Sequence, residues 1–235
     1  MKSLQVTTPS KKCSYNCPFC IAKTHPHNNQ FSNLYEDDFE KWAKNYMAIL
    51  LDNPDLKNIV ITGTNEPMQD PECVEKIIEL TRFFRNDIAI ELQTRQYSFS
   101  ELYSKLDVVA YSISQYSYLA RIKPNGKINR YVILLTDEFA NKSLEEILSQ
   151  LPSTVTQVTF KVLQDNGGNA KVESWIRTHK MKEEQICLLE EQILQYKGKL
   201  SIRLDRNCMD ATNRYEIYRE DGNLYRDWDE KVKIR

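Results

Sequence analysis

The sequence predicts an α/β protein, namely an incomplete (β/α)6 TIM-like barrel with parallel strands, followed by a C-terminal β-hairpin. Short apolar runs alternate with amphipathic stretches over roughly the first 205 residues, as in parallel β/α units. Several of these runs are apolar without alternation, which is expected of strands covered on both faces. Six such units are too few to close an eight-stranded barrel.

The strands are predicted from the apolar runs. Asn58–Thr62 (NIVIT) and Val108–Ser112 (VVAYS) are typical, because their apolar residues follow one another with little interruption. The expected strands, in chain order, are Leu4–Thr7, Asn58–Thr62, Ile88–Gln93, Val108–Ser112, Tyr131–Thr136, Gln157–Leu163 and Ser201–Leu204.

The helices are predicted between these strands. Asp37–Leu51 and Glu72–Phe84 carry their apolar residues at helical spacing. Ser143 followed by Glu146 predicts a capping box at the start of a helix over Leu144–Leu151. The other expected helical segments are Ser100–Lys105, Lys171–His179 and Glu183–Gln195.

The C-terminal segment has a different pattern. Two alternating stretches flank Asp221-Gly222 within Arg214–Trp228, which predicts a β-hairpin. We therefore expect a barrel core over residues 1–205 and an extension over residues 206–235. Two roles are open for this hairpin: it covers the core and closes an open sheet edge, or it forms a lid or substrate wall.

Composition excludes several classes of protein. A chain of 235 residues with 41% apolar and 28% charged residues fits one globular domain. A net charge of −1 favours neither nucleic acid nor an anionic membrane, and no apolar run reaches membrane-spanning length. The polar start MKSLQVTTPSKK does not resemble a signal peptide, so we expect a cytoplasmic location with reduced thiols.

Three cysteines near the amino terminus carry the clearest chemical signal. Cys13, Cys17 and Cys20 have the spacing C-x-x-x-C-x-x-C. Three thiolates on one short loop suit three corners of a 4Fe–4S cluster and leave the fourth iron open, as a catalytic site requires. A Cys3His zinc site completed by His25 or His27 is the alternative, and it would define a non-catalytic interaction module. A disulfide fits a cytoplasmic chain poorly.

This spacing resembles the signature of the radical S-adenosylmethionine (SAM) superfamily. The resemblance implies that the open iron chelates the amino and carboxylate groups of SAM. It implies that an electron, from a donor such as flavodoxin or ferredoxin, cleaves SAM to methionine and a 5′-deoxyadenosyl radical that abstracts hydrogen from substrate. Phe19 stands where that family commonly has an aromatic residue beside the adenine.

A second segment resembles the family's Gly-Gly-Glu-Pro motif. Gly63 and Glu66-Pro67 match it, whereas Thr64-Asn65 depart from the second glycine and add a residue. The resemblance implies that Gly63, Thr64, Asn65 and Glu66 lie against the methionine amino group of SAM. A simple strand-to-helix turn is the alternative.

Polar residues also follow the third and fourth predicted strands. By resemblance, Thr94 lies near the ribose or methionine of SAM and Arg95 pairs with its carboxylate. Ser112 and Ser114 are similar to the family's Ser-Leu-Asp pattern near the ribose. Polar residues at strand ends are common in α/β proteins in general.

Charged residues inside later strands form the last group. Lys161 interrupts an apolar run, where burial is costly without a partner, so we expect it to face the open barrel and meet an anionic ligand or a carboxylate. Arg130 stands at the start of the fifth expected strand, and Arg203 and Asp205, at the end of the last one, are in a position similar to that of Lys161. The alternative for each is a solvated residue or a structural ion pair.

The substrate is the least determined property. The sequence shows no cysteine-rich extension like the auxiliary-cluster (SPASM-like) modules of many peptide-modifying relatives, which favours a small-molecule or nucleotide-like substrate. Peptide modification and activation of a glycyl-radical enzyme stay open. The remaining cysteines, Cys73, Cys187 and Cys208, form no C-x-x-C pair.

Overall fold

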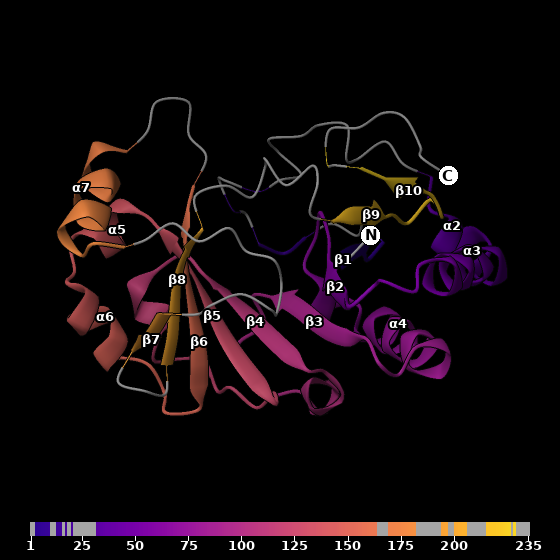
Figure 1. Ribbon diagram of the computed structural model, residues 1–235, viewed down its shortest axis with the longest axis horizontal. Coiled ribbons are helices and arrows are strands. Elements are labelled where there is room, and N and C mark those ends of the chain that lie inside the picture. Colours follow the sequence, from indigo (N-terminus) through magenta and orange to yellow (C-terminus); the bar gives the residue numbers. More distant parts are fainter. Residues whose placement is uncertain are drawn as a thin grey trace. The chain divides into compact units, whose positions relative to one another are not determined.

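The chain divides into two compact units, each of which alternates strands with helices (Figure 1). The computed structural model describes residues 3–9, 13–15, 17, 20, 32–163, 169–181, 194–196, 200–205, 215–226 and 228. The first unit comprises Met1–Thr94, Lys105–Asp107 and Met209–Arg235, and the second comprises Arg95–Ser104 and Val108–Cys208. The predicted α/β class with mostly parallel strands is confirmed, and it fits a partial barrel.

In the first unit, five strands lie in the order β10-β9-β1-β2-β3. β1 (Ser3–Thr7), β2 (Asn58–Thr62) and β3 (Ala89–Thr94) are parallel, and each lies within one residue of its predicted bounds. β9 (Glu216–Tyr218) runs parallel to β1, and β10 (Leu224–Tyr225) is antiparallel to β9.

The helices of the first unit begin at side-chain caps. The expected helix Asp37–Leu51 is instead a short α2 (Leu34–Asp37) followed by α3 (Phe39–Asp52), because Asp38 accepts a hydrogen bond from Lys41 N and caps α3. Asp70 caps α4 (Pro71–Phe84) in the same way. Both helices bury the apolar stripe that their spacing predicts; its members are Trp42, Ala43, Tyr46, Ile49 and Leu50 on α3 and Val74, Ile77 and Ile78 on α4.

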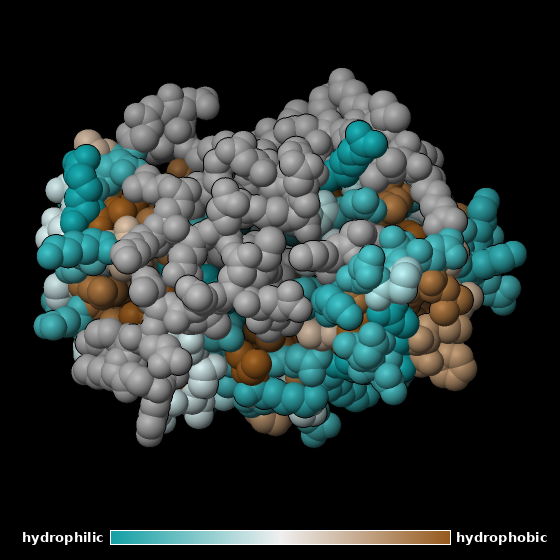
Figure 2. Space-filling model, viewed as in Figure 1, coloured by the Kyte–Doolittle hydropathy of each residue, from teal (hydrophilic) through white to brown (hydrophobic). Residues whose placement is uncertain are grey.

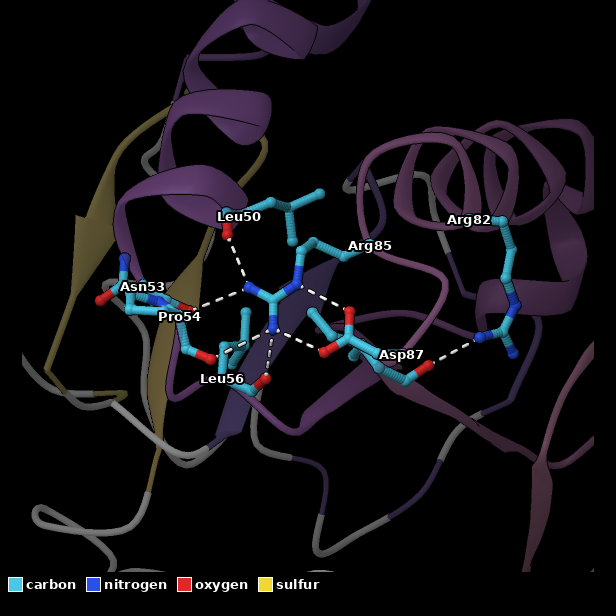
Figure 3. Close-up of polar contacts among 8 residues, drawn as sticks. Leu50, Asn53, Pro54, Leu56, Arg82, Arg85 and Asp87 are labelled. Atoms are coloured by element: carbon cyan, nitrogen blue, oxygen red, sulfur yellow. Dashed lines mark hydrogen bonds and ion pairs between the residues drawn. The ribbon is translucent and has the colours of Figure 1, made fainter.

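Arg85, which follows α4, binds the carboxyl end of α3 (Figure 3). Its Nη1 donates to the carbonyl oxygens of Leu50 and Asn53 at 3.0 and 3.2 Å, and its Nη2 donates to that of Leu56 at 3.1 Å. An ion pair with Asp87, 2.8 Å from Nε, holds the guanidinium in place. A cation thus satisfies carbonyl groups that the end of a helix leaves open.

The predicted C-terminal hairpin is confirmed, with Leu224 opposite Tyr218 and Gly222 at φ +73° in the turn. Tyr218 donates its hydroxyl to Trp42 O at 2.6 Å, and Trp42 Nε1 donates to Arg219 O at 3.1 Å. β9 also pairs with β1 and so extends the sheet beyond β1, while Tyr218 packs on Trp42 of α3. The two roles expected of the hairpin stay predictions.

In the second unit, five strands lie in the order β4-β5-β6-β8-β7. The parallel strands β4 (Val108–Ile113), β5 (Ile128–Leu135), β6 (Val155–Val162) and β8 (Leu200–Asp205) match the predicted ones, although β5 and β6 begin earlier than expected.

The predicted helix Glu183–Gln195 is wrong at its end. Leu194–Tyr196 form β7, which pairs antiparallel with β8, whereas residues 183–193 lie outside the described part of the chain. Pairing with β8 determines that this segment is a strand. Local periodicity could not predict this, because it contains no information about the partner strand.

Short helices complete the second unit: η3 (Glu101–Lys105), η4 (Tyr116–Tyr118), α5 (Asp137–Ala140), α6 (Leu144–Ser149) and α7 (Ala170–Thr178). The predicted capping box is confirmed, since Glu146 N donates to Ser143 Oγ at 3.1 Å and Ser143 N donates to Glu146 Oε2 at 2.7 Å. Among the described helices, none is long and apolar enough to cross a membrane. Most of the coloured surface in the space-filling view is hydrophilic (Figure 2).

Candidate functional site

The three motif cysteines lie on one loop that follows β1. Cys13, Cys17 and Cys20 are reduced cysteines of intermediate exposure, and Cys20 N donates to Cys17 O at 3.3 Å. In the described ranges, no three histidine, cysteine or carboxylate side chains are already gathered as a metal site. The donor chemistry nevertheless fits a cluster, because three reduced cysteines on one loop supply the three thiolates that it needs. Phe19, His25 and His27 lie outside the described residues.

The turn after β2 presents a buried carboxylate. Glu66 caps η2 (Pro67–Gln69), where its Oε1 accepts from Met68 N at 3.1 Å. The same oxygen accepts from the hydroxyl of Thr94, at the end of β3, at 2.5 Å. Glu66 is 5% exposed and Thr94 is 2% exposed. The structure thus brings together two residues that the sequence predicts as SAM ligands, and each orients the other.

Asn65 joins the loop after β1 to the turn after β2. Its Oδ1 accepts from Thr8 Oγ1 at 2.9 Å, and its Nδ2 donates to Pro9 O. Gly63 allows this contact, because a Cβ there would lie 2.6 Å from Asn65 Oδ1 and 3.0 Å from Thr8 Oγ1. Asn65, where the sequence departs from the Gly-Gly-Glu-Pro pattern, therefore tethers the loop that leads to Cys13.

A second tether lies closer to the cysteines. Ser14 N, next to Cys13, donates to Gln69 Oε1 at 3.2 Å. The cysteine loop is thus held at two points by the turn from Gly63 to Gln69, at the carboxyl ends of neighbouring parallel strands. Sequence reasoning missed Thr8 and Gln69, and no local signal marks them, because their partners lie 57 and 55 positions away.

Glu220 anchors the end of β1, where the cysteine loop begins. Its Oε2 accepts from Thr7 Oγ1 at 2.7 Å, and both residues are almost fully buried. Burial raises the pKa of the neighbouring Tyr218 above its ordinary value, so that phenol stays protonated and serves as a hydrogen-bond donor. Sequence reasoning missed Glu220 as well, since it lies 213 positions from Thr7.

The other predicted ligands lie in the second unit. Arg95 Nη2 donates to Ser114 Oγ at 2.8 Å, so these two expected site residues are in contact. The hydroxyl of Tyr97 donates to the carbonyl oxygen of Ser112 at 2.6 Å. Sequence reasoning did not indicate Tyr97. Both serines are of intermediate exposure, which leaves part of each accessible to a ligand.

No family model matches this sequence, and no curated protein matches it either. Among solved structures, SuiB of Streptococcus suis bound to S-adenosylmethionine matches with a TM-score of 0.58 and 12% identity, over 95% of this chain and 59% of SuiB. SuiB bound to its precursor peptide SuiA gives a TM-score of 0.56 and 12% identity, over 95% of this chain and 58% of that one. The chain thus spans less than two thirds of the SuiB chain.

A further match is native anSMEcpe with bound AdoMet and Cp18Cys peptide, with a TM-score of 0.60 and 13% identity over 98% of this chain and 74% of that chain. SuiB and anSMEcpe are radical SAM enzymes. The chain has the fold of that class over nearly its whole length, as the cysteine motif led us to expect.

Proposed function

We propose that this chain is a radical SAM enzyme in which Cys13, Cys17 and Cys20 hold a 4Fe–4S cluster. The observation that carries the proposal is the double tether at Asn65 and Gln69. It joins a loop with three reduced cysteines to the turn that bears the buried Glu66, in a fold shared with proteins solved with SAM bound. When bound, the cluster and SAM supply a 5′-deoxyadenosyl radical that takes a hydrogen atom from the substrate.

The residues of the chain bind and orient SAM in this proposal. The Glu66 carboxylate, held by Thr94, accepts hydrogen bonds from the cationic amine of SAM, with Gly63 and Thr64 beside it. By the family resemblance, Arg95 is assigned to the SAM carboxylate, Ser112 and Ser114 to its ribose hydroxyls, and Phe19, which lies outside the described residues, to its adenine. Such positioning is essential, because a radical of this kind attacks any C–H bond that it reaches.

A small-molecule or nucleotide-like substrate remains our first candidate. Modification of a peptide is the second, since SuiB and anSMEcpe were each solved with a peptide bound. The two differ in what co-purifies with the enzyme and in the mass of the product. The electron donor (flavodoxin or ferredoxin) and the cytoplasmic location stay predictions.

Anaerobic reconstitution with iron and sulfide tests the proposal. We expect brown protein with about four irons per chain, as a 4Fe–4S cluster requires, and release of 5′-deoxyadenosine from SAM under reducing conditions. Cys17→Ala should abolish that release, whereas Cys73→Ala, which alters a buried cysteine of α4, should retain it. Zinc in place of iron, or undiminished SAM cleavage by the Cys17 variant, would overturn the proposal.

A further inference from the structure

The turn of the C-terminal hairpin is buried, although connecting turns normally lie on the surface of a protein. Arg219 is fully buried, and Glu220 and Asp221 are 2% and 8% exposed. The backbone of the turn is also held from outside the hairpin, since Tyr35 N of α2 donates to Glu220 O at 3.1 Å. The first unit thus encloses charged residues that a hairpin facing solvent would leave in water.

Strand pairing brings this turn to the carboxyl end of β1. β9 runs parallel to β1 (Figure 1), with Tyr218 opposite Val6. The chain therefore leaves β9 in the direction in which β1 ends, at Thr7. The loop that carries Cys13 departs from the same end of β1. The buried turn and the cysteine loop thus begin beside each other, within the first unit.

The Glu220 carboxylate binds the last residue of β1. Its Oε2 accepts from Thr7 Oγ1 at 2.7 Å, and both side chains are buried. The same hydroxyl lies 3.5 Å from Tyr218 O, which is a longer contact with an uncharged oxygen, so the hydroxyl proton points to the carboxylate. A hydrogen bond to a carboxylate is stronger than one to a neutral acceptor, and burial strengthens it further. This contact fixes the Thr7 side chain.

The next residue, Thr8, is held from the other side of β1. Thr8 N donates to Thr62 O at 3.0 Å, and Thr8 Oγ1 donates to Asn65 Oδ1 at 2.9 Å. The C-terminal hairpin therefore holds Thr7, while the turn after β2 holds Thr8. Two segments that lie far apart in the sequence thus restrain consecutive residues, just where the chain turns from β1 into the cysteine loop.

The hairpin has other contacts that dock it on the first unit. Tyr218 donates its hydroxyl to Trp42 O, and Trp42 Nε1 donates to Arg219 O. The contact of Glu220 with Thr7 differs from these, because its partner is the end of β1 instead of a helix. A carboxylate buried at this point restrains the strand from which the cysteine loop departs, in addition to holding the hairpin.

We propose that Glu220 is a positioning residue for the cysteine loop, so that the C-terminal hairpin takes part in assembling the cluster. By binding Thr7, Glu220 fixes the place and direction in which the loop leaves β1. This inference rests on the proposed function, because it takes Cys13, Cys17 and Cys20 to hold a cluster. Groups that orient the ligands of a metal site commonly change its affinity without contacting the metal.

Substitutions of Thr7 test this role, because they change a single hydroxyl group. Thr7→Val removes the donor and keeps the shape of the side chain, whereas Thr7→Ser keeps the donor. In the full chain before reconstitution, we expect the Thr8 amide to exchange its hydrogen about tenfold faster in Thr7→Val than in the wild type. After reconstitution, Thr7→Val should lose iron to a chelator about tenfold faster. Thr7→Ser should resemble the wild type in both measurements.

Thr81→Val is the matched control. Thr81 is also a fully buried threonine of the first unit, and its hydroxyl donates to Ile77 O at 2.7 Å within α4. The control should lower the melting temperature but leave Thr8 exchange and iron retention unchanged. Equal loss of iron by Thr7→Val and Thr81→Val would overturn the inference, because a general loss of stability would explain both. Wild-type iron retention in Thr7→Val would overturn it too.

Glu220→Gln completes a double-mutant cycle with Thr7→Val. Once the Thr7 hydroxyl is absent, Glu220→Gln should cause little further loss of iron; strictly additive losses would show that the two residues act separately and would overturn the inference. If Thr7→Val does not fold, Glu220→Gln is compared with Thr81→Val in the same two assays. Zinc in place of iron in the wild-type chain would overturn the proposed function. Faster Thr8 exchange in Thr7→Val, with normal exchange in Thr7→Ser, would still show that Glu220 positions the loop.

Discussion

The hydroxyl of Thr94, at the end of β3, donates to Oε1 of Glu66 at 2.5 Å, although 28 positions separate them in the chain. Both side chains are buried, so the orientation of the carboxylate is set before any ligand arrives. A preorganised carboxylate loses less freedom on binding a cationic amine than a mobile one does. This contact underlies the first prediction.

Thr94→Val should weaken SAM binding by about tenfold, because a hydrogen bond to a charged group is worth about 1.5–3 kcal/mol. Calorimetry of the reconstituted protein measures the SAM dissociation constant directly. Thr156→Val, at an exposed threonine of β6, is the control and should bind SAM normally. Unchanged affinity in the Thr94 variant would contradict the role assigned to this pair.

Gly63→Ala should lower the iron content after reconstitution, because the new methyl group would meet Asn65 Oδ1 at 2.6 Å and displace the tether of the cysteine loop. Overpacking of this kind costs about 1–3 kcal/mol. Asn65→Ala removes the clashing oxygen, so adding Gly63→Ala in that background should do less further harm. A double-mutant cycle on iron content and unfolding free energy measures the coupling; strictly additive losses would argue against the proposed clash.

Tyr218→Phe should reduce the unfolding free energy by about 1 kcal/mol, because it removes a buried hydrogen bond to Trp42 O. For a chain of this size, that corresponds to a fall in melting temperature of about 2–4 °C. Tyr116→Phe removes a longer, exposed bond to Glu146 O and should change the melting temperature less. Equal shifts in the two variants would show that the C-terminal hairpin contributes little to the first unit.

Asp87→Asn should make the free energy of unfolding depend less on pH in the acid range. The hydrogen bond from Arg85 lowers the pKa of Asp87 from 3.8 to about 2. A carboxyl group whose pKa is lower in the folded state stabilises the fold above its unfolded pKa and loses that contribution as the pH falls through the folded pKa. The wild type should therefore exceed the variant in urea midpoint at about pH 5, and the gap should narrow toward about pH 2. The matched control is Asp55→Asn, at an exposed residue, and it should show no such trend; a gap that stayed constant with pH would contradict the prediction.

The sequence by itself determined the features that depend on near neighbours in the chain. Apolar runs located the parallel strands, the residues Asp221-Gly222 located the hairpin turn, and Ser143 with Glu146 located a capping box. The cysteine spacing also indicated the class of fold that the solved structures share. These features are predictable because periodicity, turn geometry and capping act over only a few residues.

Only the tertiary structure decided which distant residues meet. Asn65 reaches Thr8, Gln69 reaches Ser14, and Glu220 reaches Thr7, although each pair is separated by more than 50 positions. Strand register placed Arg130, Lys161 and Arg203 on one face of the sheet in the second unit. Pairing with β8 made Leu194–Tyr196 a strand where periodicity had predicted a helix. Such contacts arise from packing and register, which join segments whose sequences carry no mark of one another.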